Sequence, residues 1–269
     1  MKFASRKVLG FLIVAAAVAV GSGLNDAATA QAAEPPAAPK VSSFAPAKDI
    51  ASQIVAYVAR LEESVATEED FKESEAKLAK DANTLILLAL AAGLDDQENP
   101  YKAAAPAIMK AARELTQAKG YAAAKVGVAE VKKAAESTGG NPAELKWVKS
   151  ASLPALMKQV PLINSRLKRN LRGRKFKSKA KSNAGDAATL AVIAQGSMAD
   201  DSEAKKTGED VKKWYGFCTA MRDAAAALNK AIHQHDQSSA KKALGALNQS
   251  CDQCHAVFHK EAEKESDKE

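Results

Sequence analysis

The chain has 269 residues, of which 39 are Lys or Arg and 32 are Asp or Glu, so its formal net charge is +7. After the first 32 residues, no apolar run reaches the roughly 20 residues that a membrane-spanning helix needs. The composition therefore excludes a mature chain that crosses a membrane, and about 225 residues remain to fold, enough for two small domains or one large one. Ala, Leu, Lys and Glu dominate, and the alternation of β-branched residues typical of strands is absent. We therefore expect an all-α protein.

The first 32 residues have the layout of a secretory signal peptide. Three cations precede an apolar run over residues 8–24, and small residues then form cleavage-like triplets at 28–30 and 30–32. An uncleaved membrane anchor is disfavoured, because the run is too short to span a bilayer. We expect export to the periplasm or another exported location. A Pro- and Ala-rich flexible leader is expected over residues 33–46.

The folded part contains an internal repeat. The segment FKESEAKLAKDANTLILLALAAGLDD from Phe71 and the segment FKSKAKSNAGDAATLAVIAQGSMADD from Phe176 are identical at ten of 26 positions without a gap. A repeat of roughly a hundred residues is a normal domain size. The stretch STGGNP, residues 137–142, would end one unit and permit a new start.

Each repeat is expected to carry four helices, and short connections favour antiparallel packing. We therefore predict two tandem antiparallel four-helix bundles, at 47–140 and 141–265. The expected helices are 47–66, 68–92, 101–119 and 121–137 in the first repeat, and 153–171, 178–199, 206–234 and 237–263 in the second.

Two of the three cysteines lie in the stretch SCDQCHAVFHK, where Cys251, Cys254 and His255 form the pattern C-x-x-C-H. On a helix these positions share one face. Two thiols placed in this way can add to the two vinyl groups of a haem, and the imidazole can bind its iron, so the pattern predicts covalent attachment of haem c. The alternatives are a redox disulfide, which needs no histidine, and a zinc site, for which only His259 lies near.

The segment from Asp210 to Lys260 resembles the last two helices of the class II c-type cytochromes, the cytochrome c′ family. The residues that carry the resemblance, beside the C-x-x-C-H pattern, are Trp214, Phe217, Leu228, Asp236, Ala240 and Phe258. The resemblance implies a four-helix bundle with one haem on its last helix and His255 as the proximal iron ligand. At the position of His259 the family commonly has an arginine. His259 is therefore expected to be either a group that titrates beside the haem or a solvated histidine.

The resemblance also suggests a sixth ligand, because one branch of the family binds iron with a methionine from the first helix. The segment LPALMKQVPLINSRLK makes Met157 the candidate, although a helical methionine can equally be core filler. Pro154 is expected to start this helix and Pro161 to kink it. The family also has an arginine four residues before this methionine, and here that position is Leu153.

Other donors are weaker candidates. Met198 and Met221 are expected in the helices that follow, His233 and His235 are expected to face water, and Cys218 is expected to be a buried apolar residue. In the ungapped register Met157 corresponds to Ser52, and the first repeat ends in AAESTGG where the cysteines should fall. One haem per chain follows.

These patterns lead to an exported monohaem cytochrome that transfers single electrons, with a redox partner protein and the haem attachment machinery as partners. The alternative is a five-coordinate haem protein that binds nitric oxide or carbon monoxide. No enzyme signature is found. The family often forms dimers, so either a homodimer or an intramolecular pseudo-dimer with the haem-free repeat is expected.

The positive charge is concentrated in the run Arg166–Lys181, which holds nine cations and no acid. The chain without its first 32 residues carries +5, so the remainder carries −4. The run is expected between the first two helices of the second repeat. It is either a solvated loop or a surface that steers an acidic redox partner. Nucleic-acid binding is not expected of an exported chain.

Overall fold

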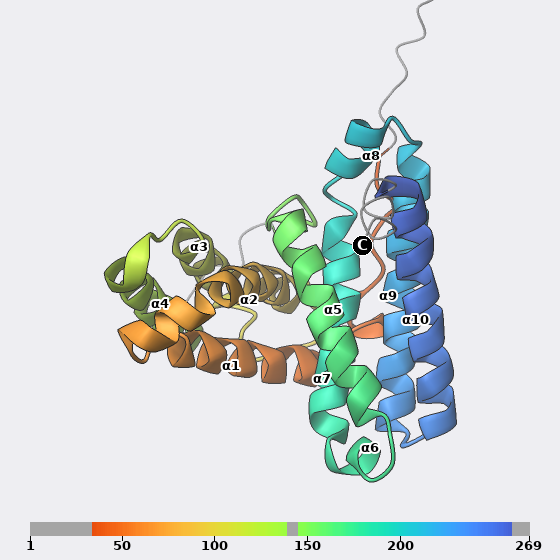
Figure 1. Cartoon of the computed structure of the whole chain (residues 1–269), viewed down its shortest axis with the longest axis horizontal. Coiled ribbons are helices and arrows are strands. Elements are labelled where there is room, and N and C mark those ends of the chain that lie inside the picture. The colour runs from red at the N-terminus through yellow and green to blue at the C-terminus, as the bar shows by residue number, and fades with distance from the viewer. Residues whose placement is uncertain (1–33, 139–144, 260–269) are drawn as a thin grey trace, which may run out of the picture. The chain divides into compact units, whose positions relative to one another are not determined.

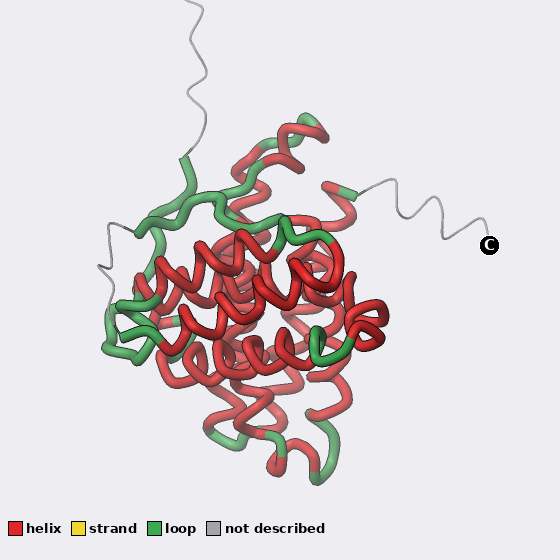
Figure 2. The backbone as a smooth tube through the Cα atoms, turned by 90° about the vertical axis from the view of Figure 1, so that its left-hand side faces the viewer, coloured by secondary structure: helices red, strands yellow, loops and turns green. Residues whose placement is uncertain are grey.

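The computed structural model describes residues 34–138 and 145–259. Within these ranges every regular element is a helix and no strand occurs, which confirms the all-α prediction (Figures 1 and 2). The predicted signal peptide lies outside the described residues. None of the described helices combines the length and apolar character that crossing a membrane requires.

The eight predicted helices are all present, together with two short α-helices and one turn of 3₁₀-helix. Their bounds are η1 Val41–Ser43, α1 Ala47–Glu63, α2 Glu68–Leu94, α3 Ala105–Leu115, α4 Gly120–Glu136, α5 Leu153–Asn170, α6 Lys175–Ser178, α7 Ala180–Ser197, α8 Ser202–Thr207, α9 Val211–His233 and α10 Gln237–Phe258.

Two local predictions need correction. The helix expected over 206–234 is interrupted, because Gly208 adopts a left-handed conformation (φ 70°) that ends α8, and Asp210 caps α9 by accepting a hydrogen bond from the Lys212 N–H at 2.9 Å. The second half of the leader at 33–46 is packed rather than flexible. Phe44 is buried, and its ring centroid lies 6.4 Å from that of Trp147.

Equivalent carboxylates of the two repeats make equivalent ion pairs. In the first repeat, Arg60 Nη2 lies 3.1 Å from Asp81 Oδ1. In the second, Arg166 donates from Nε and Nη2 to the two oxygens of Asp186, both at 2.7 Å. Asp81 and Asp186 are identical positions of the sequence repeat, and each arginine lies on the preceding long helix.

Further identical positions repeat their hydrogen bonds. Asp95 and Asp200 are both buried, and each accepts a bond from the backbone N–H two residues later, at 3.0 and 3.2 Å. Thr84 and Thr189 each donate to the carbonyl four residues earlier, both at 2.9 Å. The sequence repeat is therefore also a repeat of structure.

The ion pairs correct the register of the first helix. Arg60 and Arg166 are 106 positions apart, whereas their partners are 105 apart. The position in α1 that corresponds to Met157 in α5 is therefore Ala51 rather than Ser52. Neither Ala51 nor Ser52 has a sulfur atom, so the prediction that the first repeat lacks a counterpart of the Met157 thioether is unaffected.

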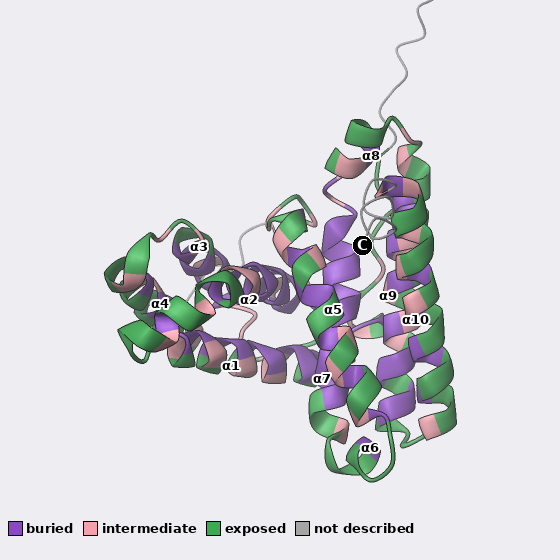
Figure 3. Cartoon of the chain, viewed as in Figure 1, coloured by how far each residue is buried: buried purple, intermediate pink, exposed green. Residues whose placement is uncertain are grey.

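The two repeats pack against each other through reciprocal helix pairs. α1 packs on α7, α2 packs on α5, and α2 also packs on α7. Since α1 corresponds to α5 and α2 to α7, this is the pattern of a two-fold interface. All residues from Asp81 to Ala92 and from Asn183 to Ser197 are buried, which fits two helices at the centre of one shared core (Figure 3).

Polar side chains are buried in this interface. Gln159 of α5 donates from Nε2 to Tyr57 Oη at 2.9 Å and to Asp81 Oδ1 at 3.0 Å. The backbone N–H of Ser152 donates to Asn83 Oδ1 at 2.7 Å. These bonds fix the start of α5, and hence one wall of the site described next, against the first repeat.

Candidate functional site

The last helix positions the C-x-x-C-H residues. Asp236 caps α10 by accepting bonds from the Ser239 N–H at 3.0 Å and from its hydroxyl at 2.6 Å. The helix then continues through Cys251, Cys254 and His255 to Phe258. The two thiols and the imidazole therefore lie at positions i, i+3 and i+4 of one face, as the sequence predicts.

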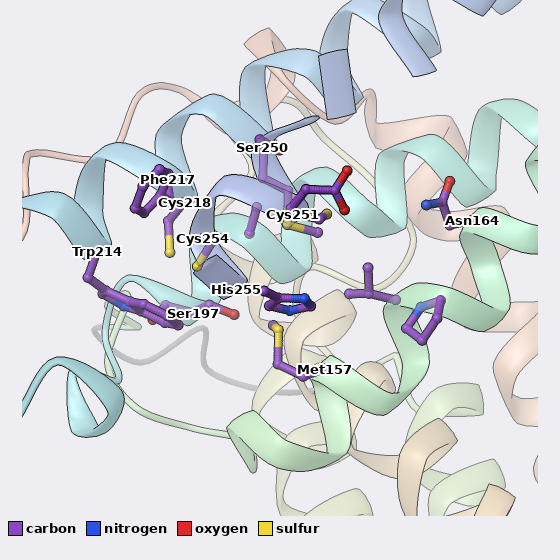
Figure 4. A pocket seen from close by; sticks show the side chains of 15 residues that line it. Met157, Asn164, Ser197, Trp214, Phe217, Cys218, Ser250, Cys251, Cys254 and His255 are labelled. Atoms are coloured by element: carbon purple, nitrogen blue, oxygen red, sulfur yellow. The ribbon is translucent and has the colours of Figure 1, made fainter. Parts of the chain in front are cut away.

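These three side chains line a cavity of about 220 Å³ between α5, α7, α9 and α10 (Figure 4). The opposite wall comes from α5, with Met157, Val160 and Pro161. The structure thus brings all four predicted site residues to one cavity. The remaining lining residues are Asn164, Ala194, Ser197, Trp214, Phe217, Cys218, Met221, Ser250 and Asp252.

Helix α5 reaches the cavity without interruption. Pro154 lies in its first turn, and the Ser152 hydroxyl accepts from the Ala155 N–H at 3.5 Å. Pro161 lies within the helix and removes one backbone donor, yet α5 continues to Asn170. Met157 is half-buried and packs on the aromatic cluster described next.

Aromatic rings close one end of the cavity. The Phe258 ring meets Trp214 edge-on at 5.4 Å between centroids, and Phe217 edge-on at 6.2 Å. Trp214 donates from Nε1 to the Ser197 carbonyl at 3.1 Å. These contacts involve three of the positions on which the family resemblance rests, and they shield the apolar end of the cavity from water.

Burial favours the neutral forms of the cavity's thiols and of its imidazole. Desolvation raises the pKa of Cys254 to about 12 and also raises the pKa values of Cys251 and Cys218. The pKa of His255 is lowered, first by desolvation and then by the nearby His259, whose ring centroid lies 5.4 Å away. A neutral imidazole keeps the lone pair that a metal ligand needs.

Two polar atoms of the cavity lining lack hydrogen-bond partners, as do six other buried side-chain atoms of the described residues. The Ser197 hydroxyl and the Asn164 carbonyl oxygen are buried and form no hydrogen bond within the described residues. Burying such atoms unpaired is unfavourable unless a ligand or water satisfies them. An apolar wall with isolated polar atoms is the lining expected for a flat apolar cofactor with polar substituents.

The donor set fits haem c, whereas the space is tight. Two thiols, one neutral imidazole and one thioether match the ligands that such a group takes. The cavity is smaller than the roughly 300–1,000 Å³ typical of ligand sites, and Met157 and His255 both project into it (Figure 4).

The alternative of a zinc site finds no support in the described ranges, where no three His, Cys, Asp or Glu side chains converge to hold a metal ion. His233 is exposed, as expected, and its Nε2 also lies 2.6 Å from Oδ2 of the buried Asp49 in α1. His235 is exposed, with a φ of 56°. Cys218 is buried, as predicted.

The sequence reasoning did not single out Ser197 or Asn164. No motif marks them, and their role at the cavity follows only from the way α5 and α7 meet. Comparisons with models of protein families, with curated proteins and with solved structures found no match to this chain. The chemistry of the site is therefore inferred from its own residues.

Proposed function

We propose that this protein is an exported monohaem c-type cytochrome that transfers single electrons. One observation carries the proposal: Cys251, Cys254 and His255 share a face of α10 and line the same apolar cavity as Met157 of α5. Haem c, when bound, would supply a one-electron couple that no side chain of the cavity offers.

The two thiols would tether the group. Each S–H would add across one vinyl C=C bond, with sulfur going to one carbon and hydrogen to the other, without net oxidation. Cys251 and Cys254 are half-buried at the cavity wall. Because burial raises their thiol pKa values, haem attachment machinery would be needed to bring the reaction about.

His255 and Met157 would hold the iron from opposite walls. Burial favours the neutral imidazole, and the thioether of Met157 needs no deprotonation. Trp214, Phe217 and Phe258 would keep water from the apolar end of the group, and a dry site with a methionine ligand raises the reduction potential. The hydroxyl of Ser197 and the amide of Asn164 offer hydrogen bonds to polar substituents.

A visible spectrum tests the proposal and separates it from gas binding. The exported protein should be low-spin, and Met157→Ala should become high-spin. Met221→Ala is the matched control, because Met221 is the other methionine of the cavity and should leave the spin state unchanged. A high-spin wild type that takes up carbon monoxide would favour the five-coordinate alternative, and a colourless protein would reject both.

The haem-free first repeat would act as an internal partner of the second, forming an intramolecular pseudo-dimer. The reciprocal packing of α1 on α7 and of α2 on α5, with Gln159 bonded to Tyr57 and Asp81, supports this role. The protein should then be monomeric in sedimentation experiments. Small-angle scattering that shows two independently tumbling bundles would refute it.

A further inference from the structure

The run that the sequence marks as basic forms a fixed cationic surface, here called the basic tip. It consists of eight exposed cations at the end of α5, in α6 and at the start of α7, namely Lys168, Arg169, Arg172, Arg174, Lys175, Lys177, Lys179 and Lys181. The ninth cation of the run, Arg166, forms an ion pair with Asp186 and is not part of the tip.

The basic tip is anchored rather than loose. Leu171 and Phe176 each expose only 2% of their surface, so the segment is pinned by two buried apolar side chains. Gln237, the first residue of α10, donates from Nε2 to the Leu171 carbonyl at 2.8 Å. Gly173, with a φ of 53°, permits the tight turn between the anchors.

The charge of the basic tip is not neutralised internally. Across residues 34–138 and 145–259, no acidic side chain forms an ion pair with any of its eight cations. A neighbouring hollow adjoins the tip at Lys181, and its lining includes Lys48 together with Asp49 and His233, which are paired with each other. A cationic surface such as the tip attracts an anionic partner.

The basic tip begins near the candidate haem cavity and extends away from it. At the near edge, Lys168 lies one helical turn beyond the cavity-lining Asn164, and its charge opposes the effect of burial on the pKa of Cys251. At the far edge, Gln237 bonds to Leu171, and 18 positions of α10, about 27 Å at the helical rise, separate Gln237 from His255.

The composition of the surface favours a lipid partner over a protein partner. Protein interfaces gain most of their affinity from buried anchors packed into pockets. Among the described residues, large hydrophobic side chains are exposed at Val55, Val126, Val148 and Leu162. None belongs to the tip, and only Val55 borders it, in a hollow with Lys179 and Lys181. An anionic lipid surface needs only the cations.

We propose that the basic tip binds anionic phospholipid headgroups and holds the protein at a membrane surface. That the protein meets such a membrane rests on the export part of the proposed function. The binding of lipid itself does not depend on haem. Each cation near an anionic lipid surface contributes about fivefold in affinity. The binding should weaken strongly with salt, as expected of attraction without apolar insertion.

Sedimentation with vesicles tests the proposal on the purified full chain. Wild type should bind vesicles of phosphatidylglycerol and phosphatidylcholine and should not bind vesicles of phosphatidylcholine alone. Changing the five lysines of the tip to Gln should reduce binding at least about 100-fold. The control changes five exposed lysines of the first repeat to Gln, giving the same net charge, and should bind like wild type. These control positions are Lys72, Lys110, Lys119, Lys125 and Lys133.

Several outcomes would overturn the proposal. The proposal is wrong if wild type binds both vesicle types equally, or if it binds neither type at physiological salt. Equal binding by the two lysine variants would show that net charge, and not the tip, is responsible. Tight binding of soluble polyglutamate without vesicle binding would point instead to an acidic protein. Staining for covalent haem on the same samples tests the proposed function separately.

Discussion

The buried carboxylate at the interface of the repeats gives a quantitative test of how the two repeats are joined. Asp81 exposes 2% of its side chain, and its Oδ1 accepts bonds from Arg60 and Gln159, while its Oδ2 has no partner. Asp81→Ala would leave the Arg60 guanidinium, itself only 21% exposed, without its counterion. Removing one partner of such a buried pair should lower the free energy of unfolding by about 3–5 kcal/mol.

Asp81→Asn should behave differently. Desolvation raises the pKa of Asp81 despite the nearby Arg60, so the carboxylate form is itself disfavoured. An amide keeps the Oδ1 acceptor for both donors, but it removes the negative charge and places an Nδ2 donor where Oδ2 has no partner, so the expected cost is about 1–3 kcal/mol, less than that of Asp81→Ala.

The raised pKa also fixes the sign of a pH effect. The native state binds the Asp81 proton more tightly than the unfolded state does, so the contribution of Asp81 to stability falls as pH rises from 3.8 to the raised pKa. Asp81→Asn should remove this part of the slope.

Urea unfolding followed by circular dichroism measures these differences, and the equivalent residue supplies the control. Asp186 makes two bonds at 2.7 Å to Arg166, which is 34% exposed and can turn to water. Asp186→Ala should therefore cost only about 1–3 kcal/mol. The reasoning is refuted if Asp81→Ala costs less than Asp186→Ala, or if Asp81→Asn is as destabilising as Asp81→Ala.

Three further outcomes follow from single contacts. Trp214→Phe should lower the free energy of unfolding by about 1 kcal/mol, because the Ser197 carbonyl loses the indole donor and keeps only the Asp200 N–H at 3.1 Å. Ser197→Ala, which removes an unpartnered hydroxyl, should not lower the free energy of unfolding, and equal losses in the two variants would contradict both statements. Gly196→Ala should cost about 1–3 kcal/mol in the same assay, because the added Cβ would lie 2.7 Å from the Leu87 side chain where α7 packs on α2; an unchanged urea midpoint would show that this contact is not tight. Cys218 should resist iodoacetamide in the native protein at pH 8 and react in urea, as measured by mass spectrometry, because burial raises its pKa; rapid native labelling would count against its burial.

The helices could be predicted because their signals are local. Apolar spacing and strong helix formers mark each long helix, and the cysteine pattern depends only on positions within α10. The break at Gly208 was missed because a glycine inside a helical pattern does not by itself show that it adopts a left-handed conformation. The burial of Phe44 was missed because its partner, Trp147, is distant in sequence.

The interface of the repeats could not be derived from local patterns. Gln159 meets Asp81 only because α5 packs on α2, and no periodicity encodes which helices pair. Asp81 and Asp186 are identical positions of the sequence repeat, so the sequence marks them as related. It does not show that each pairs with an arginine. The polar atoms of Ser197 and Asn164 became visible only when three-dimensional packing left them without hydrogen bonds.

The most direct test of the central proposal is the mass of the exported chain after denaturation. Produced in a host that attaches haem, wild type should carry the added mass of one haem and stain for it on a denaturing gel. Cys251→Ser with Cys254→Ser should lose that mass, whereas Cys218→Ser should keep it. A wild-type chain with only its polypeptide mass, or haem that survives the double substitution, would contradict the account.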